Sequence, residues 1–229
     1  MKNLLNKIHL GDCMEFMKQL PDKCIDLVLT DPPYGINADK GTNGFGSVAV
    51  RKYSGGWDKA VPGKEYFDNI LRVSKRQLIF GGNYFTDKLP VSKTWLVWDK
   101  VGEYHFNNPF ADIELIWSNL TSVSKKYTCV QQGFVSADTE KRIHPTQKPL
   151  PLFVRLLEEY AKPGMVIFDP FSGSGTTAIA CHKLGLDFIC VERDPDYHAA
   201  SVARLAKERE QGLLNLFSSQ KAEQGHLFE

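Results

Sequence analysis

Short apolar runs alternate along the chain with longer segments whose apolar residues recur every three or four positions. The short runs are rich in branched side chains, which is typical of buried strands. The longer segments have the spacing of amphipathic helices. Strands that alternate with helices predict an α/β fold with a mostly parallel sheet. The expected strands are seven, at about residues 6–10, 25–30, 77–80, 94–98, 113–117, 165–168 and 188–191.

The expected helices lie near residues 14–20, 63–74, 150–161, 176–184 and 195–212, with a short helix before residue 94. The last helix begins where Asp194 can cap its amino end and Pro195 takes its first position, and Gly212 is expected to close it. No repeat or linker divides residues 1–212, so we expect a single domain there. Residues 213–229 are polar with two apolar clusters, which predicts a flexible tail.

The composition is that of an ordinary globular protein and narrows the function only slightly. Of 229 residues, 42% are hydrophobic and 24% charged, and the net charge of +1 neither requires nor excludes a nucleic-acid partner. The five cysteines form no Cys-x-x-Cys pair and the six histidines are scattered, so we expect neither disulfides nor a metal site. Without an apolar span of membrane length or a signal segment, we expect a cytoplasmic protein with no membrane partner.

The strand near residues 25–30 runs into the sequence Asp31-Pro32-Pro33-Tyr34. Proline cannot donate a ladder hydrogen bond and stiffens the residue before it, so the strand ends in a rigid bend. This bend presents a carboxylate, backbone carbonyls and an aromatic ring at the strand end, where ligands bind in parallel sheets. It is a candidate site for a flat group that bears an amino substituent. The alternative is a rigid turn after a core strand.

A second motif, residues 165–192, reads as strand, glycine-rich turn, helix, strand and acidic residue. Gly173 and Gly175 allow a tight bend and a close backbone approach to a ligand. Glu192 stands where a carboxylate holds ribose hydroxyls in nucleotide-binding sheets, so we expect a nucleoside-containing cofactor. Two alternatives stay open. The spacing Gly173-x-Gly175-x-x-Ala178 also fits a nicotinamide or flavin enzyme, and the glycines could form a mere strand-to-helix turn.

Together, the Asp31–Tyr34 motif and the sequence Asp-Pro-Phe-x-Gly-x-Gly-Thr at 169–176 resemble the amino-group DNA methyltransferases that use S-adenosyl-L-methionine. The order of the motifs resembles their β subgroup, and Gly11-Asp12 and residues 144–149 match two further blocks. The resemblance covers nearly the whole chain. It implies a Rossmann-like methyltransferase fold, circularly permuted, with a mostly parallel seven-stranded sheet and helices on both faces.

The resemblance also implies roles for individual residues. Asp31 and the carbonyl of Pro32 would accept hydrogen bonds from the target amino group, Pro33 belongs to the same catalytic bend, and Tyr34 would stack on the base. Lys148 would meet the cofactor carboxylate and Asp12 the cofactor adenine, although a surface charge and a helix cap are the plainer interpretations of these two. The expected cofactor-binding residues are Asp12, Lys148, Asp169, Phe171, Gly173, Gly175, Thr176 and Glu192.

The implied partner is double-stranded DNA, from which the target base must be flipped out. In the family, Asp at the first motif position is more typical of adenine enzymes, so Asp31 favours adenine N6, with cytosine N4 as the alternative. An RNA amino-methyltransferase and a nucleotide-dependent oxidoreductase are less favoured. The glycine-rich segment 36–57 is expected to be a mobile loop, and residues 118–143 a short target-recognition region. Their expected DNA-binding residues are Lys40, Arg51, Lys52, Lys125, Lys126, Lys141 and Arg142.

Two partner hypotheses concern assembly. Many relatives in the β subgroup are dimers, so the resemblance implies a homodimer as one arrangement. The segment Gln224-Gly225-His226-Leu227-Phe228 resembles short peptides that dock into bacterial sliding clamps. An unremarkable flexible tail is the favoured interpretation of this segment.

Overall fold

The computed structural model describes residues 1–36, 58, 60–104, 111–120, 123–132, 135–136, 143–144 and 146–225. Most of the expected loop 36–57 lies outside this part of the chain, as do residues 226–228 of the proposed clamp-binding segment. The same is true of Lys40, Arg51, Lys52, Lys141 and Arg142.

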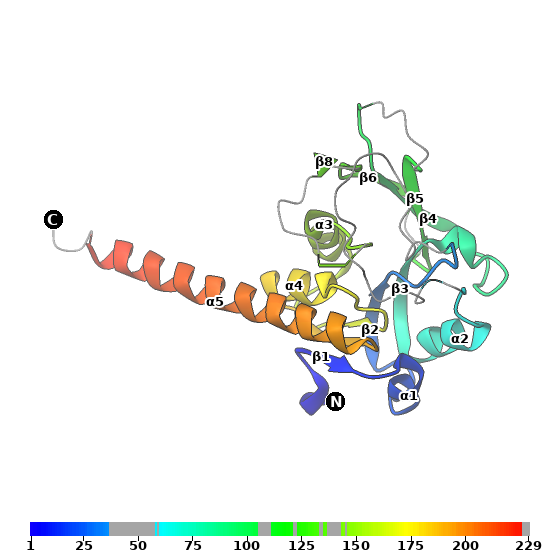
Figure 1. The fold of residues 1–229 in the computed structure, drawn as a ribbon, viewed down its shortest axis with the longest axis horizontal. Coiled ribbons are helices and arrows are strands. Elements are labelled where there is room, and N and C mark those ends of the chain that lie inside the picture. The colour runs from blue at the N-terminus through cyan, green and yellow to red at the C-terminus, as the bar shows by residue number, and fades with distance from the viewer. Residues whose placement is uncertain are drawn as a thin grey trace.

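An eight-stranded sheet forms the centre of the molecule (Figure 1). Its strands lie in the order β1 (Lys7–Leu10), β10 (Asp187–Glu192), β9 (Val166–Asp169), β2 (Ile25–Thr30), β3 (Ser74–Phe80), β5 (Ile113–Ser118), β4 (Thr94–Asp99) and β6 (Lys125–Thr128). Only β5 runs against its neighbours in this described sheet, because its pairings with β3 and β4 are antiparallel while the others are parallel. The predicted α/β fold with a mostly parallel sheet is confirmed.

The expected number of strands was one too low. All seven predicted strands are present, and β6 is added at the edge beside β4. In β6, Tyr127 is buried while its neighbours are exposed, so the segment lacks the apolar run that marks a central strand. A separate two-stranded ribbon, β7 (Gln131–Gln132) and β8 (Val135–Ser136), also falls in the expected target-recognition region 118–143.

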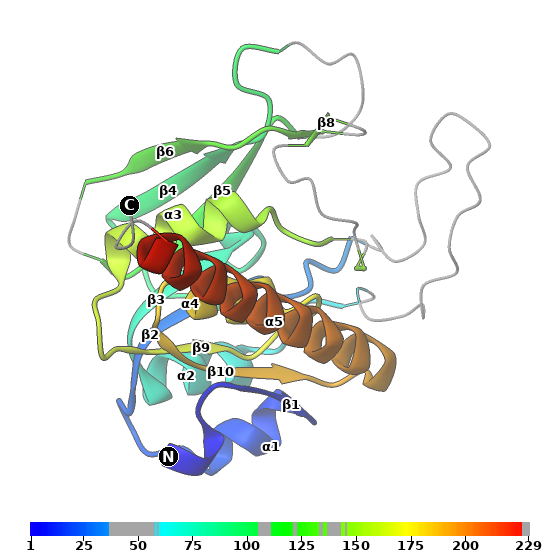
Figure 2. The ribbon, with the colours of Figure 1, turned by 90° about the vertical axis from the view of Figure 1, so that its left-hand side faces the viewer.

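Helices cover both faces of the sheet, as predicted (Figure 2). On one face lie α3 (Leu150–Tyr160), α4 (Thr176–Lys183) and the start of α5 (Pro195–Gly225), packed with Leu27 and Leu29 of β2. On the other face, α1 (Cys13–Lys18) and α2 (Lys64–Val73) pack with Val28 of the same strand. The alternation of side chains along a strand therefore divides the core into two layers. Among the described residues there are also two short 3₁₀ helices, η1 (Lys2–Leu4) and η3 (Gly82–Tyr84).

The helix α5 begins as predicted but does not end where expected. Asp194 caps it, because its Oδ1 accepts hydrogen bonds from the backbone N–H groups of Asp196 and Tyr197. The helix passes Gly212 and continues to Gly225, beyond the rest of the chain in Figure 1. An interior glycine costs a helix only about 1 kcal/mol, and the sequence on both sides of Gly212 is rich in strong helix formers. The predicted end at Gly212 was therefore wrong, while the flexibility of residues 213–229 stays a prediction.

Candidate active site

The two sequence motifs meet at the carboxyl edge of the sheet, where β2 and β9 lie side by side. Asp31 follows β2, and Asp169 is the last residue of β9. The hydroxyl of Thr30 donates to Oδ1 of Asp169 at 2.7 Å and ties the two strand ends together across 139 residues of sequence. One pocket is shared by both motifs. Its lining residues are Asp31, His144, Thr146, Gln147, Lys148, Phe153, Asp169, Ser172, Gly173, Ser174, Thr176 and Thr177.

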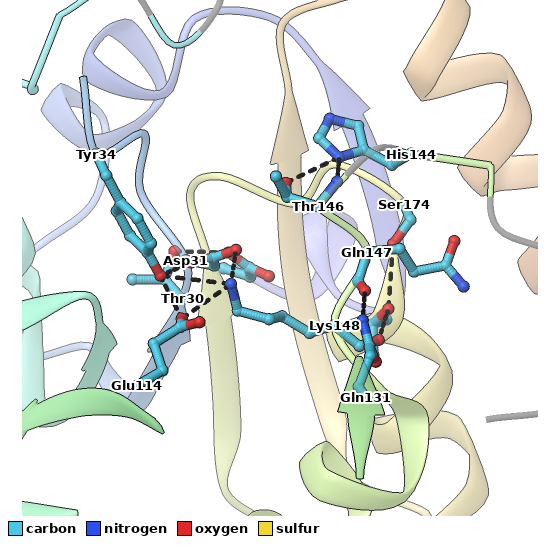
Figure 3. Close-up of polar contacts among 12 residues, drawn as sticks. Thr30, Asp31, Tyr34, Glu114, Gln131, His144, Thr146, Gln147, Lys148 and Ser174 are labelled. Carbon is cyan, nitrogen blue, oxygen red and sulfur yellow. Dashed lines mark hydrogen bonds and ion pairs between the residues drawn. The ribbon is translucent and has the colours of Figure 1, made fainter. Parts of the chain in front are cut away.

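The carboxylate of Asp31 is held by two side chains (Figure 3). Its Oδ2 lies 2.7 Å from Nζ of Lys148, and its Oδ1 accepts a hydrogen bond of 2.5 Å from the hydroxyl of Tyr34. Burial raises the pKa of Asp31, the charge of Lys148 opposes that rise, and the negative charge of Glu114 adds to it. Burial therefore disfavours the charged form of this carboxylate, and the ammonium of Lys148 favours it.

Glu114 is a member of this cluster that sequence reasoning missed. It comes from β5, and its Oε1 lies 3.0 Å from Nζ of Lys148 and 2.5 Å from the hydroxyl oxygen of Tyr34. Its side chain is only 13% exposed. A signal was present in the sequence, because Glu114 is an acidic residue inside an otherwise apolar strand, where an unpaired charge is costly.

Lys148 supplies the positive charge of the cluster from the segment just before α3. Its Nζ lies 5.4 Å from the ring centroids of Tyr34 and Phe80 and 5.8 Å from that of Trp98. Burial lowers the pKa of Lys148, but Asp31 and Glu114 outweigh this effect and raise it above its usual value. The ammonium therefore stays charged at neutral pH, and in this structure it faces the catalytic bend.

The ring of Tyr34 is fixed by close packing against the segment that follows β3. It stacks on Tyr84 with centroids 4.9 Å apart and planes at 12°, and it meets Phe85 edge-on at 6.0 Å. Gly81 has a positive φ of 65°, and a Cβ there would lie 2.2 Å from a ring carbon of Tyr34. A glycine is therefore required for this position of the ring. Pro32 is buried and Pro33 half-buried in the bend before it.

The glycine-rich turn around Gly173 is held in place by hydrogen bonds with the side chains of Glu192 and Arg204. Oε2 of Glu192 accepts a 2.8 Å hydrogen bond from the backbone N–H of Gly173. Burial raises the pKa of Glu192, and hydrogen bonds from backbone N–H groups oppose the rise. Arg204 of α5, which the sequence did not single out, donates to the carbonyl of Ser174 at 3.0 Å and to the hydroxyl of Thr176 at 3.1 Å.

Asp169 is a buried member of the pocket lining. It is 3% exposed, and it accepts hydrogen bonds from the hydroxyls of Thr30 and Thr177 and from the backbone N–H of Phe171. Burial raises the pKa of Asp169 to about 6, with these hydrogen bonds acting in the opposite direction. Its contacts make it a brace between the two motifs.

His144 forms another wall of the pocket. Its Nδ1 accepts from the backbone N–H of Thr146 at 3.3 Å, and its ring meets Tyr197 edge-on. Burial and the nearby charge of Lys148 lower the pKa of His144 to about 4, so the ring is neutral at pH 7.

The remaining predicted cofactor residues lie on the same edge of the sheet. Asp12 follows β1, which pairs with β10, and its side chain caps α1 by accepting from the N–H groups of Met14 and Glu15. This is the plainer of the two roles expected for Asp12. Phe171 packs against Tyr66 of α2 with ring centroids 6.0 Å apart.

The two predicted DNA-binding residues that the structure describes lie on β6. Lys125 forms an ion pair with Glu159, and Lys126 lies 3.1 Å from Oδ2 of Asp99. Their side chains are about half exposed, so both remain accessible while engaged with carboxylates.

Within the part of the chain that the structure describes, no group of acidic, histidine and cysteine side chains has the arrangement of a metal site. Among those same residues, no helix is both long and apolar enough to cross a membrane.

The strand order and the pocket shared by the two motifs define a Rossmann-like protein of the methyltransferase class, in which the Asp31–Tyr34 motif after β2 precedes the glycine-rich motif after β9 in the chain. Residues 82–203, more than half of the chain, match the family described as DNA methylase, and the chain belongs to this family.

Individual relatives agree with this assignment. The chain is similar to the Type II methyltransferase M.HinfI of Haemophilus influenzae, with 26% identity over 89% of this chain and 69% of that protein. Its fold is similar to that of the M1.HpyAVI complex with S-adenosylmethionine, with a TM-score of 0.58 and 22% identity over 87% of this chain and 98% of that one. It is also similar to the cytosine-N4-specific PvuII DNA methyltransferase, with a TM-score of 0.56 and 16% identity over 85% and 84% of the two chains.

Proposed function

We propose that this DNA methylase transfers a methyl group from S-adenosyl-L-methionine to the exocyclic N6 amino group of an adenine flipped out of double-stranded DNA. The observation that carries the proposal is the single pocket lined by both Asp31 and the glycine turn. A base held at Asp31 and a cofactor held at Gly173 would therefore be neighbours, as direct transfer between them requires.

The residues around the glycine turn fit the proposed cofactor. Gly173 has a positive φ of 49°, and a Cβ there would point toward the ring of His144, 3.7 Å away, across the pocket that both residues line. The turn leads into α4, whose amino-terminal N–H groups favour a carboxylate. The residues that would hold the cofactor are Asp12, Lys148, Phe171, Gly173, Gly175, Thr176 and Glu192. When bound, the cofactor supplies an electrophilic methyl group on a sulfonium centre.

For this reaction the protein has to make the amino nitrogen of the target base a better nucleophile. Its lone pair is delocalised into the base, and acceptors for both N–H hydrogens would localise it. Asp31 and the carbonyl of Pro32 are the proposed acceptors. Because Oδ2 of Asp31 contacts Lys148 in this structure, the amino group must compete with that ammonium for the carboxylate.

The cofactor carboxylate is the proposed alternative partner of Lys148. Transfer of the ammonium from Asp31 to the cofactor would free the carboxylate for the base, so that cofactor binding prepares the site for the amino group. The stacked rings of Tyr34 and Tyr84 provide an aromatic wall at this site, which can offset part of the cost of unstacking the base.

Mass spectrometry of nucleosides tests the choice of base. Duplex DNA incubated with the protein and S-adenosyl-L-methionine is digested and compared with DNA incubated with the Asp31→Ala variant. N6-methyladenine from the wild type alone supports the proposal. N4-methylcytosine without N6-methyladenine would show that the alternative base is the target, and sequencing of the modified positions gives the recognised site.

The proposed DNA contacts and assembly states need separate measurements. Deletion of residues 42–54 should weaken DNA affinity while leaving cofactor affinity unchanged. Equal affinity for DNA in the deletion variant would remove this loop from the interface. Sedimentation tests the homodimer, and a pull-down with a clamp protein, with and without Leu227→Ala and Phe228→Ala, tests the clamp hypothesis.

A further inference from the structure

Glu114 belongs to neither sequence motif, yet its carboxylate faces the catalytic bend from β5. The hydroxyl of Tyr34 lies between two acceptors, Oδ1 of Asp31 and Oε1 of Glu114, each 2.5 Å away. It therefore joins the two carboxyl groups in one continuous chain of hydrogen-bonding oxygen atoms, as Figure 3 shows.

The charges of this cluster leave it one proton short of neutrality. Asp31 and Glu114 carry two negative charges when ionised, against one positive charge on Lys148, and the three side chains are 17%, 13% and 8% exposed. An uncompensated charge in such a place is costly, so the cluster favours the uptake of one proton. Methylation of an amino group releases one proton at this place.

The hydroxyl of Tyr34 has a single hydrogen for its two acceptors. It can donate to only one carboxylate at a time, and it can accept from the other only when that carboxyl group is protonated. A proton that arrives on Asp31 can therefore pass to the Tyr34 oxygen while the Tyr34 hydrogen moves to Glu114. The oxygen atoms of Asp31, Tyr34 and Glu114 do not have to move during this exchange.

We propose that Glu114 receives, through the Tyr34 hydroxyl, the proton that the target amino group loses on methylation. The inference rests on the proposed methyl transfer to an exocyclic amino group, and it holds for adenine and cytosine alike. The nitrogen lone pair forms the new N–CH₃ bond as the sulfur–methyl bond breaks, and the sulfur keeps that electron pair. The N–H bond then breaks toward Asp31, an O–H bond forms there, and exchange through Tyr34 leaves the proton on Glu114.

The surroundings of Glu114 agree with this role. Burial and the two carboxylates raise the pKa of Tyr34 well above its usual value, so the phenol exchanges one hydrogen for another without persisting as a phenolate. The charged groups that face Glu114 are Lys148 before α3, Asp31 after β2 and Lys100 after β4. Burial lowers the pKa of Lys100 and Glu114 opposes that change, so the pH profile must be read with both lysines in mind.

Single-turnover methylation in rapid-quench experiments tests the inference from pH 6 to 9, in H₂O and D₂O. The variants are Glu114→Gln, Tyr34→Phe, which keeps the ring, and the double variant of these two. Glu114→Gly is added for rescue with formate. Glu158→Gln, an exposed carboxylate on α3, is the matched control. Thermal unfolding and binding of S-adenosylhomocysteine establish that each variant is folded and binds a nucleoside ligand.

We expect Glu114→Gln to slow the single-turnover rate by roughly 100-fold at pH 7, the usual loss when a proton-transfer group is removed. The loss should shrink as the pH rises, because hydroxide and buffer can then take the proton from Asp31 directly. Tyr34→Phe should cause a loss of the same kind, and the double variant should be no slower than the slower single variant. Formate should restore part of the activity of Glu114→Gly by replacing the missing carboxylate.

Two results would overturn the inference. One is a Glu114→Gln rate within about threefold of the wild type with an unchanged pH profile, a threefold effect being far below the loss of a proton-transfer group. The other is additive losses in the double variant with no rescue by formate, which would reduce Glu114 to a structural role. Failure of the proposed function looks different, because the wild-type protein would then methylate cytosine alone or no base at all.

Discussion

The ammonium of Lys148 lies 2.7 Å from Oδ2 of Asp31, and both side chains are largely buried. The residues are far apart in the sequence, one after β2 and the other before α3. Their contact places a fixed positive charge against the carboxylate that is proposed to accept from the target amino group. The pKa of Asp31 therefore depends on Lys148, a residue that the resemblance assigned to the cofactor.

Replacement of this cation should destabilise the fold in a pH-dependent way. Lys148→Met leaves Asp31 and Glu114 buried without their partner, a change that typically costs about 3–5 kcal/mol. The carboxyl groups can escape this cost by binding a proton, so the loss should be full at pH 8 and smaller at pH 5. Urea unfolding at both pH values measures it.

Two further variants control this experiment. Lys126→Met removes an ion pair whose lysine is 65% exposed, and it should cost no more than about 1 kcal/mol. Addition of Glu114→Gln to Lys148→Met should recover part of the stability, because one buried negative charge is removed. Equal losses for Lys148→Met at both pH values would contradict the charge assignment.

The carboxylate of Asp31 should matter for methyl transfer and not for cofactor affinity. Asp31→Asn replaces one acceptor oxygen with a donor, and we expect the single-turnover rate to fall by roughly 100- to 1,000-fold, as for other lost transition-state hydrogen bonds. Calorimetric titration should show unchanged affinity for S-adenosylhomocysteine. Asp22→Asn, at a carboxylate that is 73% exposed, serves as control. A large loss of cofactor affinity in Asp31→Asn would move Asp31 into the cofactor site.

Alanine substitutions at two glycines distinguish the cost of backbone strain from the effect of a side chain that obstructs the pocket. Gly173 and Gly185 both have positive φ, 49° and 63°, so a change to alanine should cost each about 1–2 kcal/mol of stability. A Cβ at Gly185 meets nothing within 4 Å, whereas one at Gly173 enters the pocket opposite His144. Only Gly173→Ala should lose affinity for S-adenosylhomocysteine. Equal affinities in the two variants would place the cofactor away from this turn.

Asp169 should make the wild-type protein less stable as the pH rises. Its pKa of about 6 in the folded chain lies above the usual value, so between about pH 4 and 6 the folded state binds more protons than the unfolded state. Stability from this group is present at low pH and lost as the pH passes 6. Relative to wild type, Asp169→Asn should therefore gain on the order of 3 kcal/mol between pH 4 and pH 7.

Unfolding of both proteins across this pH range provides the measurement. The difference between them isolates Asp169 from the other titrating groups. A difference that is constant with pH would show that Asp169 is ionised throughout.

The central strands could be predicted because buried strands contain short runs of apolar residues that can be recognised in the sequence. The segment 25–30 contains the buried apolar run 27–29, and its neighbours β3 and β9 contain the apolar runs 78–80 and 166–168. The edge strand β6 could not be recognised in this way, because Tyr127 alone among its four residues is buried. Gly212 was misleading for a different reason. A glycine marks a helix end only when the following sequence cannot continue the helix.

The candidate site was predictable residue by residue but not as a network. Asp31, Tyr34 and Lys148 each lie in a recognisable motif, and the order of strands accounts for the meeting of the two motifs. The hydrogen bonds among them depend on side-chain directions that local sequence does not encode. Glu114 enters because β5 runs antiparallel between β3 and β4, and this pairing brings the start of β5 to the carboxyl edge of the sheet.

The place of β9 in the sheet has a consequence for the synthesis of the protein. β9 lies between β2 and β10, and β1 at the sheet edge pairs only with β10 among the described strands. The ribosome therefore makes β2 long before β9, the strand that lies beside it. Contacts so distant in sequence form slowly, so the edge of β2 that pairs with β9 stays unpaired in the nascent chain until residues 166–169 have emerged. We expect chaperones to bind the nascent protein at that edge.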